Sequence, residues 1–267
     1  MRPAFDGECD RHASRVPFAY APVNVQESAS MAEGSGPRTD WLDRSCIVIP
    51  AYEASATLAT VIRGLREAIP ERANAILVID DGSLDGTREI AEALGVITLV
   101  HEVNRGKGAA LRTGFIAARD RGWEIALTVD ADDQHPAAEA RRVLLASPDP
   151  EEIVLGVRNL DRDGAPKANR VSNGISNFFI SQFSGRPLRD TQCGLRRYPV
   201  SRTLALGTTG QGYDFEAEVL LRAAWSGAHV VEQPVAVRYP HDRTTHFHVV
   251  RDPWRIIRTV VSTLRKR

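Results

Sequence analysis

The stretch LTVDADDQHP, residues 127–136, is an apolar run that ends on two aspartates one residue apart, followed by a polar turn and a proline. In a strand, side chains at positions i and i+2 point to the same side. At the carboxyl end of a strand, Asp130 and Asp132 can therefore share one hard divalent cation. Mg²⁺ and Mn²⁺ prefer oxygen ligands, and substrate phosphates and water usually complete their coordination. Taken alone, the two aspartates also fit a solvated turn, so the neighbouring motifs decide between these interpretations.

Two more apolar runs with polar ends lie upstream. The segment CIVIPAYE covers residues 46–53, and AILVIDDGSLDGT covers residues 75–87. In open α/β sheets, ligands bind at the carboxyl ends of the strands. We therefore expect the polar ends of all three runs to meet at one edge of a sheet. Asp, Gly and Ser are also common turn formers, so a purely structural turn is the alternative at residues 80–83.

From residue 44 onward, short apolar runs alternate with helical patterns, which predicts an α/β fold with a mostly parallel central sheet flanked by helices. The expected strands cover residues 46–50, 75–80, 97–101, 124–129 and 153–157. The expected helices cover residues 54–68, 87–94, 107–121, 137–146, 171–183 and 214–225. A short strand pair is expected across residues 228–237, and a basic amphipathic helix across residues 252–267.

The composition restricts the classes of function. The chain has 267 residues and a formal net charge of zero, so no nucleic-acid-binding surface is indicated. Its three cysteines show neither disulfide-scaffold density nor zinc spacing, and Cys46 and Cys193 are expected to be reduced. No apolar run approaches the ~18 residues that span a bilayer, and no signal peptide is recognisable. We expect a cytoplasmic protein, soluble or peripheral to the inner face of the membrane.

The chain is predicted to contain one folded domain. Residues 1–43 have no sustained period and are rich in Pro, Gly, Ala, Ser and charge, which predicts a disordered extension. Met31 is an alternative start of the protein. Residues 44–267 are expected to form the domain, with a donor-binding half at 44–158 and an acceptor-side half at 159–250, before the terminal helix.

The order of four motifs resembles the family 2 glycosyltransferases, inverting enzymes with the nucleotide-sugar-binding fold called GT-A. The motifs are Pro-x-Tyr-Glu, Asp-Asp-Gly-Ser-x-Asp-Gly-Thr, Asn-x-Gly-Lys-Gly and Asp-Ala-Asp-x-Gln-His-Pro, and the likeness extends over residues 44–246. The chain looks most like the branch of dolichyl-phosphate mannosyl- and glucosyltransferases. The resemblance implies transfer of a hexose from a UDP- or GDP-sugar to a polyprenyl phosphate or related lipid, with Mg²⁺ or Mn²⁺ as cofactor.

The resemblance also implies roles for particular residues. The metal ligands would be Asp130, Asp132 and Gln134. The donor site would contain Pro50, Tyr52, Glu53, Asp81, Lys107, Asp130, Ala131, Asp132 and Arg158. The residues acting in the reaction itself would be Asp132, Arg158 and Asp190. Within the donor site, Asp81 would contact the nucleotide base and Arg158 the diphosphate. A turn or surface role is the alternative for Gln134, Lys107 and Arg158.

Two later segments bear on the substrates. DTQCGLR, residues 190–196, closely resembles the dolichyl-phosphate glucosyltransferases, which favours UDP-glucose over GDP-mannose as donor. Asp190 is the candidate general base if the acceptor is a hydroxyl, whereas a lipid phosphate is already anionic and needs no base. GYDFEAE, residues 212–218, places the family's acid at Glu218, for which structural and acceptor-side roles are both open.

The acceptor side departs from the family pattern. The lipid-phosphate branch normally has an arginine and then Gly-x-Ser-Lys where this chain reads RYPHDRTTHFH, residues 238–248. Arg243 and His246 are the candidates for binding the acceptor's phosphate. The departure leaves open transfer to a hydroxyl of another lipid or polyketide-like acceptor. Sugar nucleotidyl transfer is a further alternative, but it normally needs a Gly-rich loop that residues 50–53 do not provide. The apolar stripe on residues 171–183 and the terminal helix are predicted either to touch the membrane or to pack against the sheet.

Overall fold

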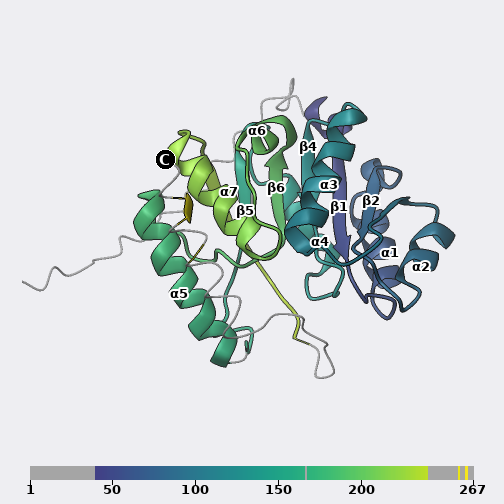
Figure 1. Ribbon diagram of the computed structural model, residues 1–267, viewed down its shortest axis with the longest axis horizontal. Coiled ribbons are helices and arrows are strands. Elements are labelled where there is room, and N and C mark those ends of the chain that lie inside the picture. Colours follow the sequence, from purple (N-terminus) through teal and green to yellow (C-terminus); the bar gives the residue numbers. More distant parts are fainter. Residues whose placement is uncertain (1–39, 166, 240–257, 259–261, 264–267) are drawn as a thin grey trace, which may run out of the picture. The chain divides into compact units, whose positions relative to one another are not determined.

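A computed structural model describes residues 40–165, 167–239, 258 and 262–263 (Figure 1). In this part of the chain the strands are β1 (Ser45–Ala51), β2 (Ile76–Asp80), β3 (Ile97–Val100), β4 (Ile125–Thr128), β5 (Ile153–Arg158), β6 (Arg196–Pro199) and β7 (Val230–Val235). The α-helices are α1 (Leu58–Ala68), α2 (Thr87–Ala93), α3 (Lys107–Asp120), α4 (Ala137–Leu144), α5 (Lys167–Ser184), α6 (Val200–Ala205) and α7 (Asp214–Trp225). Two 3₁₀-helices are η1 (Asp40–Arg44) and η2 (Pro70–Arg72).

Some predicted features lie outside the described residues. Met31, Arg243 and His246 are among them, as are most residues of the terminal helix. The boundary predicted for the N-terminal extension was wrong by a few residues. Residues 40–43 belong to η1, and Trp41 is buried there under the guanidinium of Arg197, 5.1 Å from the ring centroid.

The strands form a 7-stranded sheet in the order β3-β2-β1-β4-β6-β5-β7. Every neighbouring pair is parallel except those made by β6, which runs antiparallel to both β4 and β5. The prediction of a mostly parallel sheet is therefore confirmed. The strand pair expected across residues 228–237 was wrong, because this stretch contributes a single strand, β7, which pairs in parallel with β5.

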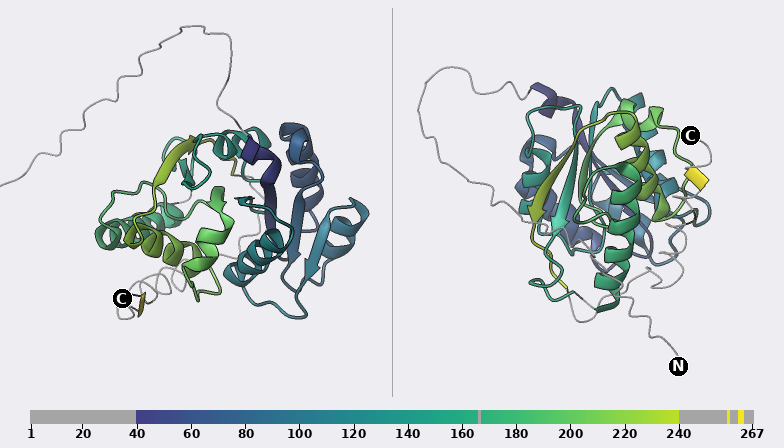
Figure 2. Two further views of the ribbon diagram at one scale, coloured as in Figure 1. Left: turned by 90° about the horizontal axis from the view of Figure 1, so that it is seen from above. Right: turned by 90° about the vertical axis from the view of Figure 1, so that its left-hand side faces the viewer.

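The core lies on both faces of the sheet (Figure 2). Side chains of β1 alternate between the two faces. Ile47 and Ile49 pack with α1 and α4 on one face, and Cys46 and Val48 pack with α3 and α7 on the other. A strand buried on both faces has to be apolar at nearly every position, which is the pattern of a central parallel strand. The helices thus hold the strand ends in place, and the loops after β1, β2 and β4 emerge at one edge.

β6 was not predicted, because its sequence, RRYP, has no apolar pattern. Arg196 and Arg197 are both 0% exposed in the structure. The guanidinium of Arg196 donates to the carbonyls of Cys193 at 2.6 Å and Thr191 at 2.8 Å, and that of Arg197 to the carbonyl of Leu144 at 3.0 Å. Carbonyl acceptors satisfy buried guanidinium donors, so the two arginines brace the loops on either side of the sheet.

Helix α5 packs against α7 and buries Ile180 in a small cluster with Leu220 and Leu221 (Figure 1). Most of its predicted apolar stripe does not face the core: Val171 is 55% exposed and Phe178 is 65% exposed. No helix in the described part of the chain is both long and apolar enough to cross a membrane.

Candidate active site

Hydrogen bonds tie the loop after β1 to the loop after β2. The backbone N–H of Glu53 donates to Ser83 Oγ at 2.9 Å, and the N–H of Leu84 donates to Glu53 Oε1 at 2.9 Å. The N–H of Ala54 donates to Thr87 Oγ1 at 2.8 Å. Glu53 adopts a positive φ of 50° here. The two motifs therefore converge as predicted, and Glu53 links the two loops by hydrogen bonds.

Other residues of the predicted donor site line the same edge. Tyr52 is 36% exposed and Pro50 is partly buried. Ala131 is buried, and its carbonyl accepts a 2.6 Å hydrogen bond from the Thr57 hydroxyl. The loop after β4 is thereby joined to the start of α1, so three strand ends meet at one place.

Asp81 is buried and hydrogen-bonded to residues of the segment between β3 and α3. One carboxylate oxygen lies 2.6 Å from His101 Nδ1 and accepts from the N–H of Arg105 at 3.0 Å, and the other accepts from the N–H of Gly106 at 2.7 Å. The residue is 3% exposed. Asp81 therefore anchors the loop that leads into α3. Its predicted contact with the nucleotide base stays a prediction, and this enclosure counts against it.

The aspartate pair follows β4. Asp132 accepts from the backbone N–H of Gln134 at 3.1 Å and from the Gln134 side-chain amide at 2.7 Å. Burial, followed by the charge of Asp130, raises the pKa of Asp132 to about 6. Burial would also raise the pKa of Asp130, but the charge and hydrogen bond of Lys107 outweigh it, and the pKa lies below its ordinary value.

These residues suit a divalent cation. Burial and then the charge of Asp130 disfavour the ionised form of Asp132 and raise its pKa, and a bound cation would offset both effects. Within the described residues, no group of three or more His, Cys, Asp or Glu side chains could hold a metal. The chain would therefore supply Asp130, Asp132 and Gln134, and phosphate oxygens and water would have to supply the remaining ligands.

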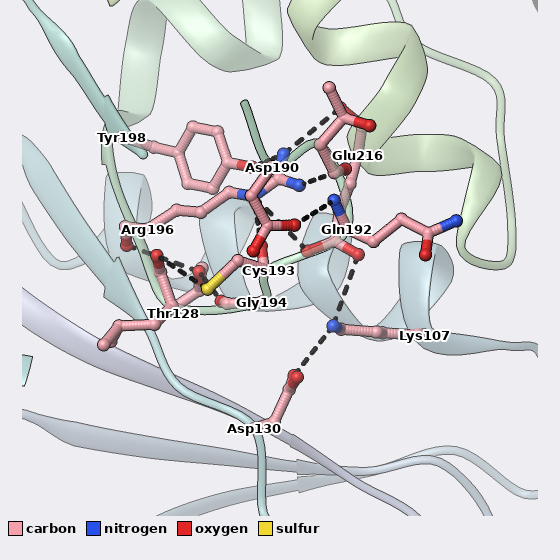
Figure 3. Close-up of polar contacts among 12 residues, drawn as sticks. Lys107, Thr128, Asp130, Asp190, Gln192, Cys193, Gly194, Arg196, Tyr198 and Glu216 are labelled. Carbon is pink, nitrogen blue, oxygen red and sulfur yellow. Dashed lines mark hydrogen bonds and ion pairs between the residues drawn. The ribbon is translucent and has the colours of Figure 1, made fainter. Parts of the chain in front are cut away.

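A glycine brings the segment 190–196 against the aspartate pair. A Cβ atom added to Gly194 would lie 2.1 Å from Asp130 Oδ2, closer than any real contact. The Thr128 hydroxyl donates to the Gly194 carbonyl at 2.9 Å (Figure 3). The motif match covered Gly194 but gave it no role, because the close approach is visible only in three dimensions.

Lys107 is paired with two carboxylates. Its Nζ atom lies 2.7 Å from Asp130 Oδ1 and 3.2 Å from Glu216 Oε2 (Figure 3). The predicted contact of Lys107 with the donor stays a prediction. Of the two roles left open for Glu218, the contacts favour the structural one, since its carboxylate accepts from the N–H groups of Thr209 and Gly210 at 2.8 and 2.9 Å.

Arg158 and Asp190 form a bidentate ion pair. Arg158 Nε lies 2.7 Å from Asp190 Oδ2, and Arg158 Nη2 lies 3.0 Å from Asp190 Oδ1. The N–H of Gln192 also donates to Asp190 Oδ1 at 3.2 Å. Burial opposes ionisation, but the charge and hydrogen bonds of Arg158 hold the pKa of Asp190 below its ordinary value. The general-base role of Asp190 stays a prediction, and this pairing counts against it.

Cys193 and His135 lie beside this pair. Cys46 and Cys193 are both free and buried, as expected. The Cys193 sulfur lies 3.7 Å from His135 Nε2. Burial is the main cause that lowers the pKa of His135 to about 4, so the imidazole is neutral at pH 7 and belongs to the loop's packing.

Known proteins are similar to this chain over the region that contains these residues. A model of the family described as Glycosyl transferase family 2 matches residues 46–200. Glycosyltransferase AglJ of Haloferax volcanii is 32% identical over 79% of this chain and 68% of its own. The undecaprenyl-phosphate mannosyltransferase of Micrococcus luteus is 27% identical over 72% of this chain and 82% of its own. The glucosyl-3-phosphoglycerate synthase of Mycobacterium tuberculosis, solved with Mg²⁺ and uridine-diphosphate, is 18% identical and has a TM-score of 0.64 over 87% of this chain and 84% of its own.

Proposed function

The chain belongs to the family 2 glycosyltransferases and has the GT-A fold, and we propose that it moves a hexose from a nucleoside diphosphate sugar to a polyprenyl phosphate. The observation that carries this proposal is the aspartate pair after β4, with Gly194 packed directly on Asp130. The pair lies at the carboxyl edge of the parallel strands, where ligands of such sheets bind. The similarity to the undecaprenyl-phosphate mannosyltransferase of Micrococcus luteus supports a polyprenyl phosphate as the acceptor class.

The proposed reaction needs stabilisation of a departing diphosphate. A divalent cation held by Asp130, Asp132 and Gln134 would supply positive charge to that group. Arg158 adds a second positive charge, and its field favours the ionised form of both aspartates. Asp190 keeps the Arg158 guanidinium in one orientation through two hydrogen bonds. The chain therefore holds one guanidinium, that of Arg158, in a fixed orientation near the aspartate pair.

The state of Asp190 bears on the acceptor. A general base must have a free lone pair and a pKa close to the working pH. Each oxygen of Asp190 already accepts two hydrogen bonds, and its pKa is lowered. An acceptor that arrives as an anion needs no base. The pairing therefore supports a lipid phosphate over a lipid hydroxyl, with inversion at the anomeric carbon as the family resemblance implies.

The donor is tested by a panel of nucleotides and sugars. We propose UDP-glucose over GDP-mannose from the segment 190–196, and the expected result is a larger rise in Tm with UDP than with GDP, seen only with Mn²⁺ or Mg²⁺ present. Transfer of labelled hexose to undecaprenyl phosphate is then measured for the wild type, Asp132→Ala and the surface control Asp120→Ala. Equal transfer by Asp132→Ala and the control would refute the proposed function, and a larger shift with GDP would change only the donor.

Membrane contact through α5 is part of the same proposal. In this helix polar residues are buried and apolar residues are exposed. Ser172, Asn173 and Ser176 are at most 3% exposed, whereas Val171 and Phe178 lie on the exposed side. Its buried polar face touches the active-site segment, where Ser176 Oγ lies 2.8 Å from Thr191 Oγ1. The helix has no acidic residue, and Lys167 and Arg170 occupy its first turn. An apolar face with basic neighbours suits an anionic bilayer, which would bring the lipid acceptor to the site.

Vesicle binding tests this contact. We expect Val171→Ser/Ile175→Ser/Phe178→Ser to lose most of the co-sedimentation with phosphatidylglycerol-containing vesicles, while Val103→Ser, which changes an equally exposed apolar residue, keeps it. Residues 171, 175 and 178 are 55%, 39% and 65% exposed, and residue 103 is 67% exposed, so none of these changes removes core packing. Undiminished sedimentation of the triple variant would place the membrane contact elsewhere.

A further inference from the structure

Lys107 forms an ion pair with Asp130, one of the two aspartates proposed to hold a metal. Its Nζ atom is 2.7 Å from Asp130 Oδ1, within the range of a charge-assisted hydrogen bond, and its side chain is only 14% exposed (Figure 3). A single positive charge therefore already neutralises one of the two carboxylates proposed to bind the cation. Asp132 has no such partner among the described residues, and its carboxylate accepts only from Gln134 there.

Glu216 fixes the position of Lys107. Its side chain is 4% exposed, and Oε2 lies 3.2 Å from Lys107 Nζ. Two glycines allow this contact, because a Cβ on Gly106 would lie 2.4 Å from the Gln211 carbonyl oxygen and one on Gly108 would lie 2.5 Å from the Phe215 Cβ. The first turn of α3 is thereby pressed against the start of α7, where Glu216 is located. No other described side chain holds Lys107 by an ion pair except Asp130.

Lys107 and Arg196 differ in how firmly they are held. Arg196 lies 3.8 Å from Glu216 Oε1 and is fixed by carbonyl acceptors, including those of Cys193 and Thr191. Lys107 has a flexible four-carbon stem and ion pairs but no carbonyl partner. Arg196 is thus a permanent counter-charge for Glu216. Lys107, by contrast, is held by side chains alone: Asp130, Glu216 and the ring of Tyr213, whose centroid lies 5.5 Å from Nζ.

We propose that Lys107 is an internal counter-cation that occupies Asp130 until a metal–diphosphate complex replaces it, and that Glu216 is the positioning residue that holds Lys107 there. The proposal rests on the proposed metal-dependent donor site. A divalent cation that binds without a diphosphate is repelled by the positive charge of Lys107. When the cation arrives with a diphosphate, Lys107 moves from Asp130 to the added negative charge while Glu216 keeps it nearby. Metal and nucleoside diphosphate therefore bind with positive coupling.

The experiment measures Mn²⁺ binding without acceptor or turnover. The Kd of Mn²⁺ is determined by electron paramagnetic resonance of free Mn²⁺, with no nucleotide, with UDP and with GDP, and the coupling factor is the ratio of Kd without and with nucleotide. We expect Lys107→Met to bind Mn²⁺ alone about tenfold more tightly, a change of about 1.4 kcal/mol, and to lose most of the coupling. Lys107→Arg should restore both values towards those of the wild type, and the control Arg119→Met, which removes an exposed cation of the same helix, should change neither.

Glu216→Gln tests the positioning role separately, because it keeps Lys107 and the shape of the side chain. We expect a smaller coupling factor and a higher donor KM, with kcat changed less. If Lys107→Met does not fold, Glu216→Gln alone decides the proposal. Coupling equal to that of the wild type in Lys107→Met, or in Glu216→Gln, would overturn the corresponding role. A wild type that binds no Mn²⁺ even with nucleotide would instead refute the metal-dependent function, and this proposal with it.

Discussion

The ion pair between Arg158 and Asp190 gives the sharpest test of the site's structure. Asp190 is fully buried, the Arg158 side chain is 13% exposed, and their closest atoms are 2.7 Å apart. Asp190→Asn keeps the shape of the side chain but leaves the guanidinium buried without its counter-charge. Removing one partner of a buried pair costs about 3–5 kcal/mol of unfolding free energy. For a domain of this size that corresponds to a fall in Tm of roughly 6–20 °C.

The assay is a double-mutant cycle in urea. Unfolding free energies are measured for the wild type, Asp190→Asn, Arg158→Met and the double variant. Because the second change removes the charge that the first left unpaired, the double variant should be more stable than the sum of the two losses predicts, by about 3 kcal/mol. The pKa of Asp190 is lowered in the folded state. The stabilisation is therefore fully present above the unfolded-state pKa of about 3.9 and is lost as the pH falls further, through the folded-state value.

Two results would refute this reasoning. A loss below about 1 kcal/mol in Asp190→Asn would mean that the pair behaves as an exposed salt bridge. A normal fold in Asp190→Asn, combined with loss of the acidic limb of the pH profile for a hydroxyl acceptor, would restore Asp190 as general base. The lipid phosphate would then lose its main structural support.

Further outcomes follow from the same residues. Asp130→Ala and Asp132→Ala should each abolish Mn²⁺ binding and transfer while unfolding stays cooperative, and full turnover by either in chelator-treated buffer would contradict the metal site. Gly194→Ala should weaken binding of Mn²⁺ with UDP by about tenfold or more, because its Cβ would lie 2.1 Å from Asp130 Oδ2, whereas Gly174→Ala, which meets nothing within 4 Å, is the unchanged control. Mn²⁺ binding should weaken as the pH falls through about 6, since Asp132 takes up a proton there, and isothermal titration at several pH values checks this. His246→Lys should flatten any loss of acceptor affinity between about pH 6 and 8, because a permanent cation replaces a group with a reference pKa of about 6.5, and acceptor KM measured across that range decides it.

Much of the fold could be predicted from local sequence. β1, β2 and β5 are continuous apolar runs, and their bounds differ from the predicted ones by a residue or so. α7 begins and ends where its pattern predicted. α1 begins at Leu58 rather than residue 54, and the N–H groups of Ala54 and Ser55 before it bond to the side chains of Thr87 and Asp85. These two partners lie 33 and 30 residues away in the chain, so no local pattern can indicate them.

Part of the candidate site could be proposed from the sequence. Asp130, Asp132 and Gln134 stand in one motif directly after an apolar run, although β4 ends at Thr128, before both aspartates. The hydrogen-bonding roles of Asp81 and Glu53 could not be predicted from the sequence. Both carboxylates face backbone N–H groups of other loops, at 2.7 Å from Gly106 and 2.9 Å from Leu84. A motif specifies that an acid is present, but its hydrogen-bond partners come from loops that converge only in the folded chain.

The sequence alone determined which runs become strands, where the aspartate pair lies and that the chain resembles family 2 glycosyltransferases, because these depend on residue type and short spacing. Only the tertiary structure decided that RRYP forms a buried strand, that α5 turns Val171 and Phe178 outward, and that Lys107 lies between Asp130 and Glu216. Each of these is a matter of charge or burial between residues distant in the chain. Buried arginines need carbonyls from separate loops, and an ion pair forms wherever packing brings opposite charges within about 3 Å.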